Sequence, residues 1–91
     1  MNGVYCIKDV KAGSFQPGLY VFPTDGLAVR ALASPRALDQ LGLVKDYPGD
    51  FDLYRLGDFS VDTGALTCDV KFVAHFAIAI VTGKQIGRAH V

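Results

Sequence analysis

The chain has 91 residues, 51% of them hydrophobic, and its nine Lys and Arg residues balance nine acidic residues, all of which are Asp. This length predicts a single domain, and the apolar share excludes an intrinsically disordered chain. The balanced charge excludes the strong basic excess of proteins that bind nucleic acid mainly through its phosphates. The aspartates favour turns and helix starts, because their short side chains bond to nearby backbone amides.

Two strands joined by a turn are predicted at the N-terminus. Residues 3–10 and 15–22 are rich in β-branched and aromatic residues, and a short turn sequence separates them. Pro17 and Gly18 interrupt the second segment, which is typical of an edge strand or a β-bulge. We therefore expect an N-terminal β-hairpin.

The apolar residues then take the period of a helix. Thr24 is a candidate N-cap with Asp25 in the first turn. Ser34 and Pro35 are expected to end this helix and to begin a short second one, which Gly42 stops. The residues predicted to share the apolar face of the first helix are Leu27, Ala28, Ala31 and Leu32.

The remaining elements are predicted to be strands. Residues 44–50 are expected to form a loop, 51–59 a third strand and 65–70 a fourth, with Gly64 in the turn between them. Residues 71–81 fit a fifth strand or a short helix, and their Phe, Val and Ile content favours the strand. The predicted fold class is α+β: a small antiparallel sheet of four to five strands in β-β-α-β-β-β order, with one main helix packed on one face.

The sequence offers little for catalysis. It contains no phosphate-binding glycine loop, no serine-hydrolase elbow and no zinc-protease motif. Cys6 and Cys68 lack metal or redox spacing and are expected to be buried or half-buried free thiols. His75 lies in an apolar run, which predicts a core or interface histidine with a satisfied ring. Five aspartates between residues 46 and 62 do not match a calcium loop. We therefore expect no enzymatic activity, no cofactor and no metal.

Nearly all aromatic residues fall on predicted strands. A sheet that presents aromatic rings beside Lys and Arg can stack single-stranded bases. A small sheet also needs aromatic residues for its core, so the pattern leaves both uses open. The candidate nucleic-acid-binding residues are Lys8, Lys11, Tyr54, Arg55 and Lys71.

Residues 47–66, YPGDFDLYRLGDFSVDTGAL, resemble a motif of the small non-structural protein of microviruses, the gokushovirus-type single-stranded DNA phages (phage open-reading-frame-five type family). The resemblance extends over about residues 3–80 and includes the predicted hairpin and the Ala28-x-Arg30 step of the helix. Ser60 stands where the family pattern has Asp. The positions that match the motif are Pro48, Asp50, Phe51, Leu53, Tyr54, Leu56, Gly57, Phe59, Thr63 and Gly64.

The resemblance implies a non-structural phage protein, made in the host bacterial cytoplasm, that binds single-stranded viral DNA in genome replication or packaging. It brings no catalytic residues. The balanced charge weakens the DNA hypothesis, because phosphate binding depends on Lys and Arg. The alternative is a non-enzymatic module that forms a homodimer or contacts a phage or host replication or packaging protein without binding DNA. No membrane partner is expected, because the longest apolar run is about half a membrane span.

The last residues match something other than the family. Residues 85–91, QIGRAHV, look like a translated sequencing adapter. We therefore expect residues 1–83 to form the single α+β domain and residues 84–91 to be a non-native, disordered tail. Without Arg88, eight basic residues face nine acidic residues, a formal charge of −1.

Overall fold

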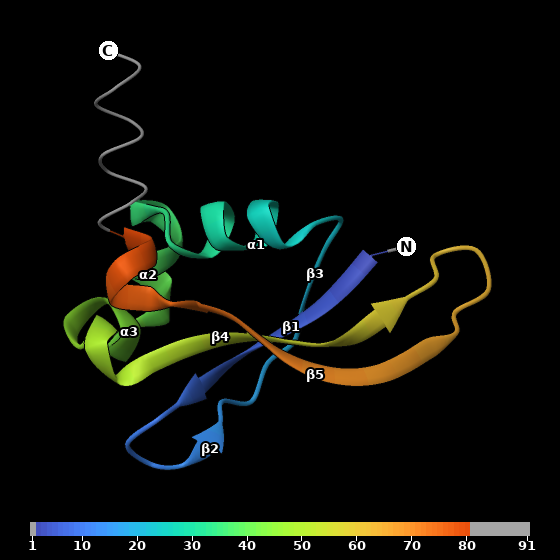
Figure 1. Cartoon of the computed structure of the whole chain (residues 1–91). Coiled ribbons are helices and arrows are strands. Elements are labelled where there is room, and N and C mark those ends of the chain that lie inside the picture. The colour runs from blue at the N-terminus through green and yellow to red at the C-terminus, as the bar shows by residue number, and fades with distance from the viewer. Residues whose placement is uncertain (1, 81–91) are drawn as a thin grey trace.

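The computed structural model describes residues 2–80, and the predicted tail at residues 84–91 lies outside them. Within these residues a five-stranded antiparallel sheet carries helices on one face (Figure 1), which confirms the α+β prediction. Residues 76–80 add a helical turn after the last strand. In chain order the elements are β1 (Asn2–Asp9), β2 (Ser14–Phe15), β3 (Tyr20–Phe22), α1 (Asp25–Leu32), α2 (Pro35–Leu41), α3 (Leu43–Asp46), the 3-10 helix η1 (Pro48–Asp50), β4 (Phe51–Phe59) and β5 (Leu66–His75).

The strands lie in the order β2-β1-β4-β5, and β3 also pairs with β1. The N-terminal hairpin is therefore confirmed, but its second strand is divided into two short pieces. The break falls at Pro17, which has no backbone N–H to donate, and at Gly18, whose φ is 141°. One long edge of β1 is thus lined by β2 and β3, and the other pairs with β4 along eight residues.

The predicted caps set the limits of the helices. The Thr24 hydroxyl accepts a hydrogen bond from the backbone N–H of Leu27 at 3.2 Å, and the Ser34 hydroxyl accepts one from Ala37 at 3.3 Å. Pro35 occupies the first turn of α2, and Gly42 ends this helix with a φ of 61°. Short, well-capped helices can therefore follow one another closely over one face of the sheet.

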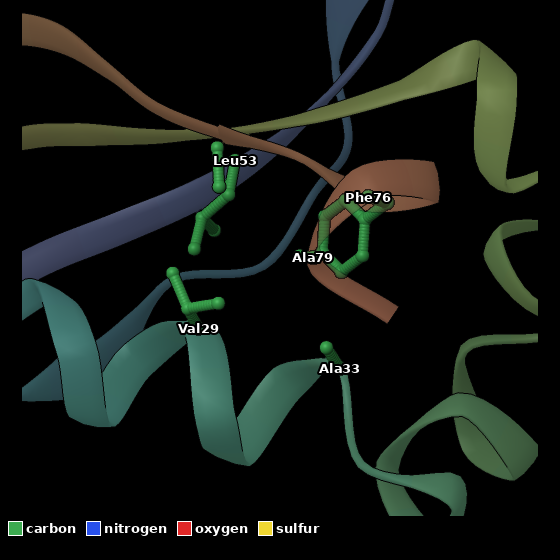
Figure 2. Close-up of a pocket in the computed structure, with 6 residues that line it drawn as sticks. Val29, Ala33, Leu53, Phe76 and Ala79 are labelled. Atoms are coloured by element: carbon green, nitrogen blue, oxygen red, sulfur yellow. The ribbon is translucent and has the colours of Figure 1, made fainter. Parts of the chain in front are cut away.

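The core lies between the helices and one face of the sheet. Figure 2 shows Val29 of α1 and Ala33, the residue that follows this helix, facing Leu53 of β4, with Phe76 and Ala79 beside them. The predicted apolar face of α1 is partly wrong: Leu27 is exposed and Ala31 half-buried, whereas Val29 packs against the core. The buried residues of this core are Tyr5, Ile7, Ala28, Leu32, Leu38, Val44, Phe51, Leu53 and Phe76.

Two predicted segments are wrong in part. Residues 44–50 are not an extended loop but form most of α3 and the whole of η1, because buried Val44 anchors a helical turn in the core.

Residues 71–75 continue β5 instead of forming a separate strand, and residues 76–80 are helical. His75 pairs with Asp52, and the partner strand β4 extends only one residue further in this direction, to Phe51. The pairing of β5 with β4 therefore stops at His75, and Phe76 turns into the core. Residue 81, the last of the predicted strand, lies outside the described part of the chain.

The β4–β5 hairpin is the longest feature of the sheet, and its turn projects beyond the helices (Figure 1). Gly64 has a φ of 77° in this turn, as predicted. The register shifts twice along the hairpin, once after Leu53 and once after Arg55. Residues 66–72 of β5 are all exposed, so this part of the hairpin has no cover from the helix layer.

Candidate nucleic-acid interface

Neighbouring residues of β4 point to opposite faces of the sheet. Tyr54 lies opposite Cys6 of β1 and Phe72 of β5, on the face without helices, which we call the open face. Arg55 lies opposite Tyr5, whose side chain is in the core, and reaches Asp25 at the start of α1. The structure therefore does not bring the predicted Tyr54 and Arg55 together on one surface.

Three aromatic side chains from three strands meet on the open face. The Tyr54 ring centroid lies 5.4 Å from that of Phe15 and 5.8 Å from that of Phe72. Both contacts are edge-to-face, the geometry that the charge distribution of aromatic rings favours. Phe15 is 40% exposed and Phe72 57% exposed, while Tyr54 between them is half-buried. We call Phe15, Tyr54 and Phe72 the aromatic row.

Lys8 supplies a positive charge beside this row. Its Nζ lies 5.7 Å from the centroid of the Phe15 ring and 5.6 Å from that of Tyr54. Both distances are within the range of cation–π attraction, so the ammonium group is held among the rings. Lys11, the second predicted basic residue of this region, lies in the exposed turn between β1 and β2.

Arg55 is instead bound to carboxylates on the helix-covered side. It donates to Asp25 at 2.8 Å and forms a second ion pair with Asp58, and its guanidinium lies 5.8 Å from the centroid of the Tyr5 ring. The hydrogen bonds to Asp58 and to Asp25 raise the pKa of Arg55 above its usual value. Two carboxylates offset its charge, so Arg55 acts as a link between β4 and α1.

Lys71 follows Arg55 to the same side. It lies opposite Arg55 in the β4–β5 ladder, and its Nζ is 3.1 Å from a carboxylate oxygen of Asp69. Both members of this ion pair are well exposed. Of the five predicted residues, the structure thus joins Lys8 and Tyr54, places Lys11 in the adjoining turn, and separates Arg55 and Lys71 from them.

His75 has the satisfied ring that the sequence predicts. Its Nδ1 lies 2.5 Å from Oδ1 of Asp52, the residue opposite it in β4. Asp52 also lies opposite Lys8 in β1, so an acidic side chain occupies the open face next to the lysine. Between residues 2 and 80, no three His, Cys, Asp or Glu side chains are grouped as metal binding requires.

The two cysteines differ in environment. Cys6 is buried, its thiol donates to the carbonyl of Gln16 at 3.2 Å, and burial raises its pKa. It therefore stays a protonated, structural thiol. Cys68 is exposed, so the expectation of burial is wrong for this residue, because its part of β5 has no helix over it.

The structure also contains an apolar groove beside α1, which includes Phe72 of the aromatic row in its lining. It has a volume of about 670 Å³ and lies between α1 and residues 72–79. Val29 and Ala33 form one wall and Val73 and Ile78 the other. None of the helices between residues 2 and 80 has the length and hydropathy that a bilayer span requires.

Phe15 and Phe72 are the members of the open face that sequence reasoning did not select. Both are recognisable as aromatic residues of predicted strands, but their position beside Tyr54 depends on pairing between strands far apart in the chain. The break after β2 has a sequence signal in Pro17 and Gly18, but the register shifts between β4 and β5, which set the position of Phe72, have none.

The fold and the site define a small α+β domain with one helix-covered sheet face and one open face that carries aromatic rings and a lysine. A family model described as Phage ORF5 protein matches residues 2–79, and the chain belongs to this family of bacteriophage proteins. The match includes every strand of the sheet and all three helices of the core. No curated protein and no solved structure matches the chain.

Proposed function

We propose that this phage protein binds single-stranded DNA on the open face of its sheet. The observation that carries the proposal is the aromatic row, with Lys8 Nζ less than 6 Å from two of its rings. Exposed aromatic side chains on a sheet can stack unpaired bases of any sequence, and a neighbouring cation attracts the backbone between them. Membership of a bacteriophage family supports a viral nucleic acid as the partner.

The charges of the open face predict a binding mode dominated by stacking. Within residues 2–80, Lys8 and Lys11 form no ion pair with an acidic side chain, whereas Lys45, Arg55 and Lys71 do. Neutralisation of two phosphates gives a salt slope of about −1.4 for a single strand. Affinity should therefore depend more on the rings than on the salt concentration.

The same proposal gives the protein a place in the phage cycle. It is a non-enzymatic, non-structural protein of a microvirus that acts in the host cytoplasm, where replication or packaging exposes single-stranded genomes. The motif from residues 47 to 66 supports this assignment through its resemblance to the microvirus protein, and it contains Tyr54 at the centre of the row.

Fluorescence anisotropy with labelled single-stranded and double-stranded oligonucleotides tests the proposal. We expect the whole chain to favour the single strand, with the shallow salt slope given above. Phe72→Ala should weaken this binding by about 5-fold to 150-fold, because the loss of one stacking ring costs about 1–3 kcal/mol. Lys8→Gln should weaken it less and reduce the salt slope by about half.

Matched substitutions away from the open face control this experiment. Tyr47 is an exposed aromatic residue before η1, and Lys45 is an exposed lysine of α3, so Tyr47→Leu and Lys45→Gln remove the same chemical groups elsewhere. Neither control should change the affinity. Absence of binding by the unsubstituted chain at low salt, or equal losses in the control variants, would show that the open face is not a DNA site.

A further inference from the structure

The free edge of β5 differs from the opposite edge of the sheet. Between residues 2 and 80, β5 pairs only with β4, and it is ten residues long. The opposite edge consists of the two-residue β2 and the three-residue β3. Short edge strands limit unwanted pairing, whereas a long one presents a continuous row of backbone donors and acceptors. β5 therefore has the form of a strand that pairs with another strand.

Apolar side chains of β5 are exposed along this edge. Val70 is 59% and Phe72 57% exposed, and both belong to the part of β5, residues 66–72, in which every residue is exposed. A two-stranded hairpin that is bare on both faces is only marginally stable in water, so a further strand beside β5 would stabilise it. Pairing would also remove part of these apolar side chains from water.

The order of charges on β5 fits a second copy of the same strand. Asp69 and Lys71 flank Val70, and their ion pair shows that both side chains lie on the helix-covered side. When two identical strands pair antiparallel about a two-fold axis at Val70, Asp69 lies opposite the partner's Lys71, and Lys71 lies opposite the partner's Asp69. The two-fold symmetry thus produces two ion pairs from one acid and one base.

The other side of the strand fits the same register. Phe72 lies on the open face with Tyr54, and strand alternation places Val70 and Cys68 on that face too. The axis at Val70 sets this residue opposite the partner's Val70, and Phe72 opposite the partner's Cys68. Only apolar or small side chains meet there, and no like charges oppose each other on either side.

We propose that the protein forms a two-fold symmetric dimer through antiparallel pairing of β5 with β5, in the register centred on Val70. The two sheets join into one, and the two aromatic rows lie on the same continuous open face. The dimer does not depend on DNA binding, so it can be tested without nucleic acid.

Charge exchange at the two flanking positions tests the dimer and its register. We expect light scattering after size-exclusion chromatography to show a dimer of the whole chain. Asp69→Lys and Lys71→Asp should each abolish it, because each sets like charges opposite each other twice. An equimolar mixture of the two variants should restore a dimer, since every opposed pair is then an acid and a base. Asp39→Lys breaks an exposed ion pair of the helices and should leave the dimer unchanged.

A cross-link tests the axis directly. In a Cys68→Ser background, Val70→Cys places a thiol opposite its own copy, and antiparallel pairs come close enough for a disulfide. We expect a covalent dimer under a mild oxidant from Val70→Cys and none from Val61→Cys, an exposed position in the turn. A monomeric unsubstituted chain at every concentration, or a mixture of the charge variants that stays monomeric, would overturn the proposal.

Discussion

Gly57→Ala is expected to destabilise the fold by about 3 kcal/mol or more, at the severe end for a single substitution. A Cβ at residue 57 would lie 1.9 Å from the carbonyl oxygen of Thr67 in the neighbouring strand. The obstacle is backbone, so no side-chain rotation relieves it, and β4 and β5 would have to separate where Gly57 pairs with Cys68. Since a domain of this size has about 5–15 kcal/mol of stability, the loss is a large fraction of the total.

Gly49→Ala is the matched control for this substitution. Gly49 belongs to the same sequence motif, but an added Cβ there meets nothing within 4 Å. Its effect should stay within about 0.5 kcal/mol. Urea unfolding followed by circular dichroism measures both variants, and equal stabilities of the two would contradict the close approach of β4 and β5 at Gly57.

Tyr5→Phe is expected to change how stability depends on pH. The Tyr5 ring is fully buried, and its hydroxyl donates to Oδ1 of Asp25 at 2.6 Å. Burial, followed by this hydrogen bond, raises the pKa of Tyr5 to about 12. The same bond is the main cause that lowers the pKa of Asp25. The variant keeps the packing of the ring and removes the bond, which should cost about 1.5 kcal/mol near neutral pH, because the Asp25 carboxylate is half-exposed.

The direction of the pH effect follows from these two pKa shifts. Above about pH 10 the unfolded chain releases the Tyr5 proton while the folded chain keeps it, so stability falls by roughly 2–3 kcal/mol between about pH 10 and 12. The Asp25 contribution is present above the pKa of an unfolded Asp, about 4, and is lost as the pH falls below it. The free energy of unfolding of the unsubstituted chain should thus exceed that of Tyr5→Phe by a constant amount between about pH 4 and about pH 10, and this difference should disappear near about pH 11.

Urea titrations of both chains across this pH range measure the difference directly. Groups common to both chains cancel in the comparison, which leaves Tyr5 and its effect on Asp25. A difference that stays constant up to about pH 11 would show that the Tyr5 hydroxyl ionises as readily in the folded chain as in the unfolded chain.

Local chemistry made several elements predictable. Thr24, Ser34 and Pro35 identify the helix starts because a cap acts within three residues, and β4 was predicted with its observed limits, residues 51–59. Residues 76–80 were not predictable in this way. Their Phe and Ile content suits a strand, but a strand needs a partner, and β4 begins too late to supply one. Tertiary pairing decides that segment.

The candidate site was predictable only in part, for a similar reason. The aromatic pattern pointed to Tyr54, and proximity in sequence suggested that Arg55 and Lys71 accompany it. Strand alternation places Arg55 under the helices, where Asp25 and Asp58 bind it. Alternation was available from sequence, but the position of the acidic partner at residue 25 depends on how α1 packs across the sheet.

The division of β4 between two faces also affects how the family can diverge. Arg55 and Leu53 hold the helix layer, whereas Tyr54 contacts side chains of the open face. Substitutions at Phe15, Tyr54 and Phe72 can therefore change what the open face binds while the core stays intact. Insertion of one residue within β4 would exchange the two roles at once, so selection should tolerate point changes there and remove changes in strand length.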